Sequence, residues 1–147
     1  MKQLAYLVLI SMVLFSYSTG QARNTISQFS IEDALSQGEA ESKLNSSIRL
    51  FFGDQEHPAV ERQLGTYTSN KKTNAFNKSD KEACEWAFLS AIMSLQDRAI
   101  AEGGNAVVNI RSFYYKKEFS SATEFECGAG NVVAGVTMKG DVVKLAE

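Results

Sequence analysis

The stretch from Ser79 to Arg111 constrains the fold most, because it encodes a long helix, a glycine stop and a strand in succession. Ser79 and Glu82 have the spacing of a capping box, in which each side chain satisfies a free backbone donor of the first turn. Apolar residues then recur with helical periodicity, at Cys84, Ala87, Phe88, Ala91, Ile92, Leu95 and Ala99. This pattern predicts a helix of about Asp80–Glu102 with one face packed on a core.

The residues after this helix read as a series of strands. Gly103 and Gly104 end the helix, since glycine readily adopts the left-handed conformation of a helix end. Apolar residues of alternating character follow, and glycines and polar residues separate the later runs. We expect an antiparallel meander of Ala106–Lys117, Ala122–Cys127 and Asn131–Met138, then a turn at Gly140 and Asp141 before Val142–Leu145.

The N-terminal half adds fewer elements. Ser30 is the predicted N-cap of a helix that runs from Ile31 towards Leu44, and the segments 48–52 and 65–71 read as strands. Strands that are grouped, and do not alternate with helices, indicate an α+β fold. We therefore expect an antiparallel sheet of about four to six strands, packed by the long helix, with a shorter N-terminal helix.

Residues 1–22 have the features of a signal peptide. Lys2 supplies the positive start, Leu4–Phe15 the apolar region, and Gly20 with Ala22 a small-x-small cleavage site. We expect cleavage before Arg23, with a cut before Gln21 as the alternative. Residues 23–147 would then form a single α+β domain, periplasmic or secreted. No cysteine follows the apolar region for lipid attachment, so we expect no stable membrane anchor.

The formal net charge is −2, and removal of residues 1–22, which include Lys2 and no acid, makes it about −3. A mildly acidic chain argues against a general affinity for nucleic acid or anionic membranes.

The chain has two cysteines, Cys84 in the long helix and Cys127 in a later strand. Both fall on faces whose periodicity points inward, and an exported chain with an even cysteine count favours a disulfide. The alternative is a pair of buried free thiols. A redox or metal role has less support, because the pair is widely spaced and no histidine is nearby.

A second apolar set on the long helix lies beside the core stripe, at Trp86, Leu89, Met93 and Ile100. One sheet face does not require this extra apolar surface, so another segment should cover it. The N-terminal part of the same chain is one candidate, and a subunit interface in a homo-oligomer is the other.

No catalytic, cofactor-binding or metal-binding constellation is evident, so we expect a protein that is not an enzyme and carries no cofactor. His57 is the only histidine and precedes Pro58 in a polar loop. The glycines at 128, 130 and 135 fail the spacing of a dinucleotide loop. One expected strand places Arg111, Phe113, Tyr115 and Lys117 on one face, an aromatic and basic stripe that is more typical of a covered sheet face than of base stacking.

Three segments, FFGDQEHP, GGNAVVNIRSFYYK and EFECGAG, resemble those of small exported proteobacterial proteins labelled "excinuclease ATPase subunit". That label disagrees with this chain, which has neither a phosphate loop nor a zinc-finger cysteine set. The helix followed by GGNAVVNI is also similar, over about half the chain, to YbjQ-like heavy-metal-binding domains and to the envelope stress sensor RcsF. The first likeness implies oligomers and metal binding, and the second implies an envelope sensing role.

From these observations we expect an exported envelope protein that works as a binding or interaction module, for an envelope protein or a small ligand. The second apolar set and the lack of catalytic groups motivate this hypothesis. The alternative is a periplasmic protein that binds or sequesters metal, which only the resemblance to YbjQ-like domains motivates.

Overall fold

A computed structural model describes residues 22–147, so the predicted signal peptide lies outside the described residues except for Ala22. The elements in chain order are β1 (Thr25–Ser30), α2 (Ile31–Leu35), α3 (Ala40–Lys43), β2 (Arg49–Phe52), β3 (Val60–Asn74), α4 (Asp80–Ala101), β4 (Ala106–Ser112), the 3-10 turn η1 (Tyr114–Lys116), β5 (Glu124–Ala129) and β6 (Val133–Leu145). No helix in this part of the chain has the length and apolar character needed to cross a membrane.

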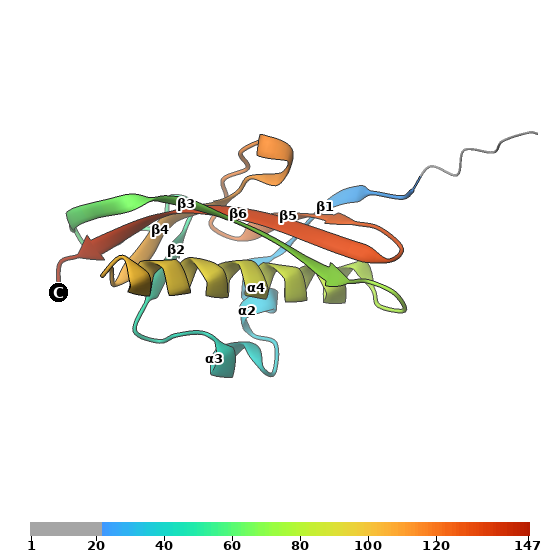
Figure 1. Ribbon diagram of the computed structural model, residues 1–147, viewed down its shortest axis with the longest axis horizontal. Helices are drawn as coiled ribbons and strands as arrows, with labels where there is room; N and C mark the ends of the chain where they lie inside the picture. The colour runs from blue at the N-terminus through green and yellow to red at the C-terminus, as the bar shows by residue number, and fades with distance from the viewer. Residues whose placement is uncertain (1–21) are drawn as a thin grey trace, which may run out of the picture.

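The six strands form one sheet, and α4 runs across one of its faces (Figure 1). The predicted α+β fold, with one long helix and a short helix near the N-terminus, is confirmed. The strand order is β1-β5-β6-β4-β2, with β3 paired to the other side of β6. The β2–β4 pair is parallel and the remaining pairs are antiparallel, so the sheet is mixed and not, as the sequence predicts, antiparallel throughout.

The caps of α4 form as the sequence predicts. The hydroxyl of Ser79 accepts a hydrogen bond from the backbone N–H of Glu82 at 3.1 Å. At the other end Gly103 has a φ of +77°, which a residue with a side chain rarely adopts. The buried face of α4 covers the sheet, where Phe88 stacks on Phe125 of β5 with ring centroids 4.2 Å apart.

Residues 25–30, for which the sequence gives no clear signal, form β1 at the sheet edge. Three local expectations are wrong. The predicted helix Ile31–Leu44 divides into α2 and α3 around the SQGE segment that contains Gly38. β6 runs straight through Gly140. The glycine there makes room for Val107, whose Cγ1 a side chain at this position would meet at 2.5 Å. Finally, β4 ends at Ser112, five residues before the predicted Lys117.

β4 and β5 share one edge of β6, since β5 pairs near its start and β4 pairs from Met138 onward. The buried Ser112 joins them at this fork. Its hydroxyl accepts a hydrogen bond from the N–H of Glu126 in β5 at 2.8 Å and lies 3.6 Å from the sulfur of Met138 in β6. From this point the chain leaves the sheet on the face opposite α4.

Candidate functional site

A protruding loop, residues 113–118, rises from the face of the sheet opposite α4 (Figure 1, orange). Its base is closed by two hydrogen bonds of 2.9 Å between the backbones of Ser112 and Phe119. Tyr115 and Lys116 at its tip have φ values of 51° and 60°. These values lie in the left-handed region of backbone conformation, where each non-glycine residue stores roughly 1–3 kcal/mol of strain. Such strain is concentrated at functional sites.

Within this loop, Tyr114 lies over a pair of glycines. Gly128 of β5 and Gly135 of β6 are direct partners in the sheet. A methyl group on Gly128 would come within 2.0 Å of the Tyr114 hydroxyl, and one on Gly135 would lie 3.7 Å from the ring. The missing side chains therefore leave the space that the tyrosine ring occupies.

Asn24, just before β1, ties the two tyrosines to the N-terminal segment. Its amide nitrogen donates to the Tyr115 hydroxyl at 2.7 Å, and the Tyr114 hydroxyl lies 3.5 Å from its oxygen. The ring centroids of Tyr114 and Tyr115 are 4.5 Å apart. Burial, followed by the neighbouring Tyr115, raises the pKa of Tyr114, so its hydroxyl stays protonated at neutral pH.

A pocket of about 600 Å³ lies between the loop, the start of the described chain and strands β3, β5 and β6. We call it the open-face pocket. Three rings, three cationic side chains and four neutral polar side chains contribute to its lining. They are Phe113, Tyr114 and Tyr115; Arg23, Lys72 and Lys116; and Asn24, Thr68, Asn70 and Thr137. The lining contains no carboxylate, histidine or cysteine.

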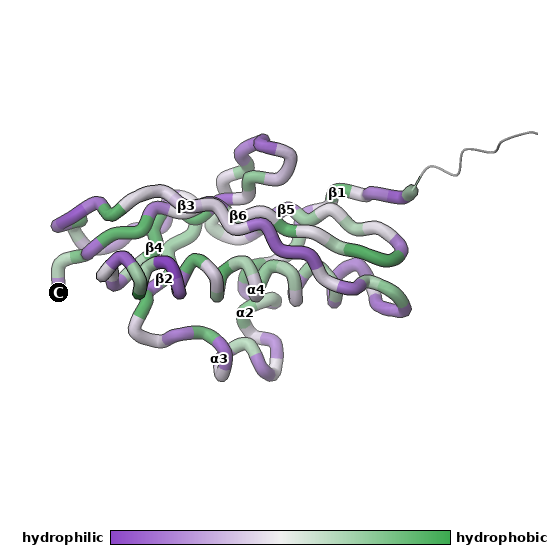
Figure 2. Tube along the Cα trace, in the orientation of Figure 1, coloured by the Kyte–Doolittle hydropathy of each residue, from purple (hydrophilic) through white to green (hydrophobic). Residues whose placement is uncertain are grey.

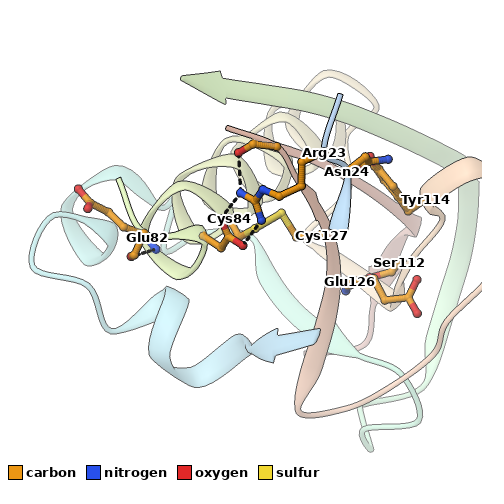
Figure 3. Close-up of a disulfide and its surroundings, with 11 residues drawn as sticks. Arg23, Asn24, Glu82, Cys84, Ser112, Tyr114, Glu126 and Cys127 are labelled. Atoms are coloured by element: carbon orange, nitrogen blue, oxygen red, sulfur yellow. Dashed lines mark hydrogen bonds and ion pairs between the residues drawn. A yellow bond between two sulfur atoms is a disulfide. The ribbon is translucent and has the colours of Figure 1, made fainter. Parts of the chain in front are cut away.

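The three cations differ in how firmly they are held. Arg23 donates to both carboxylate oxygens of Asp80, at 2.9 and 2.8 Å, and to the Asn131 side chain and the Gly130 carbonyl (Figure 3). These bonds lower the pKa of Asp80. Lys72 and Lys116 make no ion pair with any residue of the described chain. Their ammonium groups are therefore available to a ligand.

A disulfide between Cys84 and Cys127 fastens β5, one wall of the pocket, to α4 (Figure 3). The predicted pairing is confirmed, with the two Cα atoms 5.9 Å apart and both residues fully buried. Because successive residues of a strand face opposite sides, Cys127 points to α4 and Gly128 points to the pocket. The bridge thus fixes β5, the strand against which the Tyr114 ring packs.

The four residues of the second apolar set on α4 differ in their exposure to solvent. Leu89 is buried, Trp86 and Met93 are half-buried, and Ile100 is exposed. Lys43 of α3 places its ammonium group 4.5 Å from the centre of the Trp86 ring. The N-terminal segment, one of the two predicted covers, therefore reaches part of this surface.

The predicted stripe of Arg111, Phe113, Tyr115 and Lys117 on one strand face is wrong, because β4 ends before Phe113. Arg111 pairs with Glu118 and Asp141 at 3.3 and 3.7 Å, while Phe113 and Tyr115 line the open-face pocket. His57 is exposed in its loop, with Nδ1 2.8 Å from the Pro58 carbonyl, and is not part of the pocket.

Sequence reasoning missed the pocket itself. Two sequence features point to it. Polar residues alternate along β3, at Thr68, Asn70 and Lys72. Gly128 and Gly135 are neighbours in the sheet, where they leave space for a side chain and do not form a nucleotide-binding loop. Residues 22–147 contain no group of three or more His, Cys, Asp or Glu side chains placed to hold a metal ion. No family model, curated protein or solved structure matches the chain.

Proposed function

We propose that this chain is an exported, non-enzymatic binding protein of the cell envelope and that the open-face pocket takes a small anionic ligand with a flat or apolar part. One observation carries the proposal: three cations and three aromatic rings line the pocket, and no carboxylate does. Ammonium groups attract an anion, and a ring stacks on a flat ligand surface at the offset geometry that aromatic pairs prefer.

The construction of the pocket supports ligand binding over a purely structural role. Tyr115 is 65% exposed although it is a large ring held in a strained backbone conformation. Asn24 fixes its hydroxyl, so the ring is positioned without being buried. A loop built only for packing would turn such a ring inward, whereas a binding site gains from a ring that is oriented in advance.

Two observations support the envelope location. The apolar start of the chain has the pattern of an export signal, and the described residues carry a buried disulfide, which persists in oxidising compartments. The metal-binding alternative gains no support from the described side chains, because the cysteines are bridged and no group of metal-binding side chains is assembled.

Calorimetric titration with phenyl phosphate tests the pocket, with inorganic phosphate and phenol as partial probes. We expect phenyl phosphate to bind more tightly than either, because it offers both the charge and the ring. Lys72→Ala and Tyr115→Ala should each weaken its binding roughly tenfold, as the loss of one charge-assisted contact or one stacked ring does.

Lys117→Ala is the matched control, since Lys117 is an exposed cation of the same loop but does not line the pocket. It should leave phenyl phosphate binding unchanged. Absence of binding by the unmodified protein, or equal weakening by Lys117→Ala and Lys72→Ala, would overturn the assignment of the open-face pocket.

A further inference from the structure

Three exposed apolar side chains gather at one end of the molecule, at the turns that join β3 to α4 and β5 to β6. Phe76 is 61% exposed, Val132 60% and Val133 47%. We call these three residues the apolar tip. Single exposed apolar residues are common on protein surfaces, but adjacent ones at turn corners are unusual, because turns favour glycine, asparagine, aspartate and serine.

The turn that carries Phe76 is well ordered by hydrogen bonds. The N–H of Lys78 donates to the Ala75 carbonyl at 3.1 Å, which closes a four-residue turn with Phe76 at its first corner. Asn77 takes the second corner with a φ of 58°, and the Asn74 side chain accepts from the N–H of Phe76 at 2.9 Å. The exposure of Phe76 is therefore fixed by local structure.

The second turn is tied to the first. The N–H of Gly130 donates to the Val133 carbonyl at 2.8 Å, and the N–H of Ala75 donates to the Val132 carbonyl at 2.7 Å. Figure 1 places both turns at the same end of the molecule, where Figure 2 shows hydrophobic colour at each. The two corners thus form one surface with a fixed shape.

The charges around the apolar tip are mostly positive, although the whole chain is acidic. Lys71, Lys72 and Lys78 make no ion pair within residues 22–147. Asp80 is neutralised by Arg23 at 2.8 Å, which leaves Glu82 as the nearby unpaired acid of the described chain. The net charge predicts no general attraction to anionic membranes, but this end has its own local excess of lysines.

The described chain also begins at this end, because Arg23 bonds to Gly130 and Asn131 in the β5–β6 turn. The apolar stretch Leu4–Phe15 precedes it in the sequence. The predicted leader therefore joins the described domain at the same end as the apolar tip.

We propose that the apolar tip docks on a lipid bilayer surface that contains anionic lipids, with Phe76 and Val132 entering the interface and the lysines lying among the headgroups. Amphipathic surfaces bind bilayers in this way, through buried apolar area together with attraction between basic side chains and anionic lipids. The apolar tip and its lysines share Val133 and Lys72 with the lining of the open-face pocket, but Phe76 and Val132 lie outside that lining, so this inference does not depend on the ligand of the pocket.

Tryptophan fluorescence with lipids brominated in their acyl chains tests the geometry. In a Trp86→Phe background, Phe76→Trp should be quenched by brominated vesicles of phosphatidylethanolamine and phosphatidylglycerol. Ile100→Trp is the control, because Ile100 is 48% exposed near the opposite end of α4. Its fluorescence should not change. Val132→Trp provides a second reporter at the tip if Phe76→Trp does not fold.

Binding strength gives an independent readout. Phe76→Ser should lower the partition coefficient onto these vesicles, measured by sedimentation, roughly tenfold. Vesicles of phosphatidylcholine alone should bind less of the unmodified protein. The proposal fails if the tip reporters stay unquenched, if Ile100→Trp is quenched equally, or if light scattering shows that Phe76→Ser instead splits a dimer. That last result would assign the tip to a second copy of the chain.

Discussion

The hydroxyl of Tyr114 occupies the space that a side chain on Gly128 would fill, since a methyl group at Gly128 would lie only 2.0 Å from it. This relationship joins the two halves of the candidate site. Gly128 belongs to the strand that the disulfide fixes on α4, and Tyr114 belongs to the strained loop that covers the opposite face. The pocket therefore depends on the absence of a side chain at one position of β5.

Gly128→Ala should displace Tyr114 and disturb the pocket. Because the Tyr114 ring would have to move off β5 and lose its contacts there, we expect the free energy of unfolding to fall by about 1–3 kcal/mol. The binding of phenyl phosphate should weaken as well. Urea denaturation and calorimetric titration measure the two effects.

Gly135→Ala is the control for this prediction. Gly135 faces Gly128 across the sheet, but a methyl group there would meet its nearest neighbours at 3.7 Å, an ordinary contact distance. We expect a clearly smaller loss of stability. Equal effects of the two substitutions would show that the gap at Gly128 has no special role.

Removal of the disulfide should destabilise the protein without changing its fold. The cysteines are 43 residues apart in sequence, and in the chain-entropy model a loop of that size is worth about 4 kcal/mol. We expect the Cys84→Ala/Cys127→Ala variant to unfold at lower urea concentration with a similar circular dichroism spectrum. Because both cysteines are bridged and fully buried, they should react with alkylating agents only after denaturation and reduction. Alkylation of the native, unreduced chain would contradict this arrangement.

The long helix was predictable because its signals are local. The Ser79 cap, the apolar spacing and Gly103 lie within one stretch, and each acts through neighbours three or four residues away. The pairing of Cys84 with Cys127 was predictable for a related reason, since periodicity places each on an inward face and no other cysteine competes.

The sheet was harder to predict because its signals depend on partners distant in sequence. Gly140 reads as a turn in isolation, yet it is a strand residue where Val107 packs against the backbone. Asn109 has a φ of 49° and lies where the register between β4 and β6 shifts, so the alternation of apolar residues breaks there. Neither effect is visible without the neighbouring strand.

The pocket was hidden for the same reason. The segment Phe113–Lys117 has three aromatic residues and directly follows the apolar strand β4, so it reads as a continuation of that strand. The turn at Tyr115 and Lys116 has none of the usual glycine or proline signals. Its shape follows from contacts with Asn24, Gly128 and Thr137, which come from three other parts of the chain.

Glu85 should make stability depend on pH in the direction opposite to most acids. It is a buried carboxyl near Lys81, Asp33 and Gln37, with one oxygen that has no hydrogen-bond partner among the described residues. Burial raises its pKa above the ordinary 4.5. A raised pKa in the folded state means that the contribution of Glu85 is complete below its unfolded pKa and is lost as pH rises through the folded pKa.

Glu85→Gln should therefore increase the free energy of unfolding at neutral pH relative to the unmodified protein, and the difference should shrink as pH falls through the raised folded-state pKa and vanish below the ordinary value of 4.5. Urea denaturation across this pH range measures the difference. Glu82→Gln, an exposed acid of the same helix, should give no increase at neutral pH. A lower stability of Glu85→Gln at neutral pH would show that the ion pair with Lys81 outweighs burial.

Gly140→Ala tests whether α4 and the sheet pack as closely as the structure shows. A methyl group at Gly140 would meet Cγ1 of Val107 at 2.5 Å, Cγ1 of Ile110 at 3.4 Å and Cδ1 of Leu95 at 3.6 Å. All three neighbours are buried, so they cannot move into solvent, and we expect a loss of about 1–3 kcal/mol in the free energy of unfolding. Gly38→Ala is the matched control, because nothing lies within 4 Å of a methyl group there. That substitution should be neutral or slightly stabilising, since alanine has less conformational freedom to lose on folding. If Gly140→Ala were equally neutral, β6 would have to turn at Gly140 in solution, as the sequence alone predicts, and the continuous strand would be wrong.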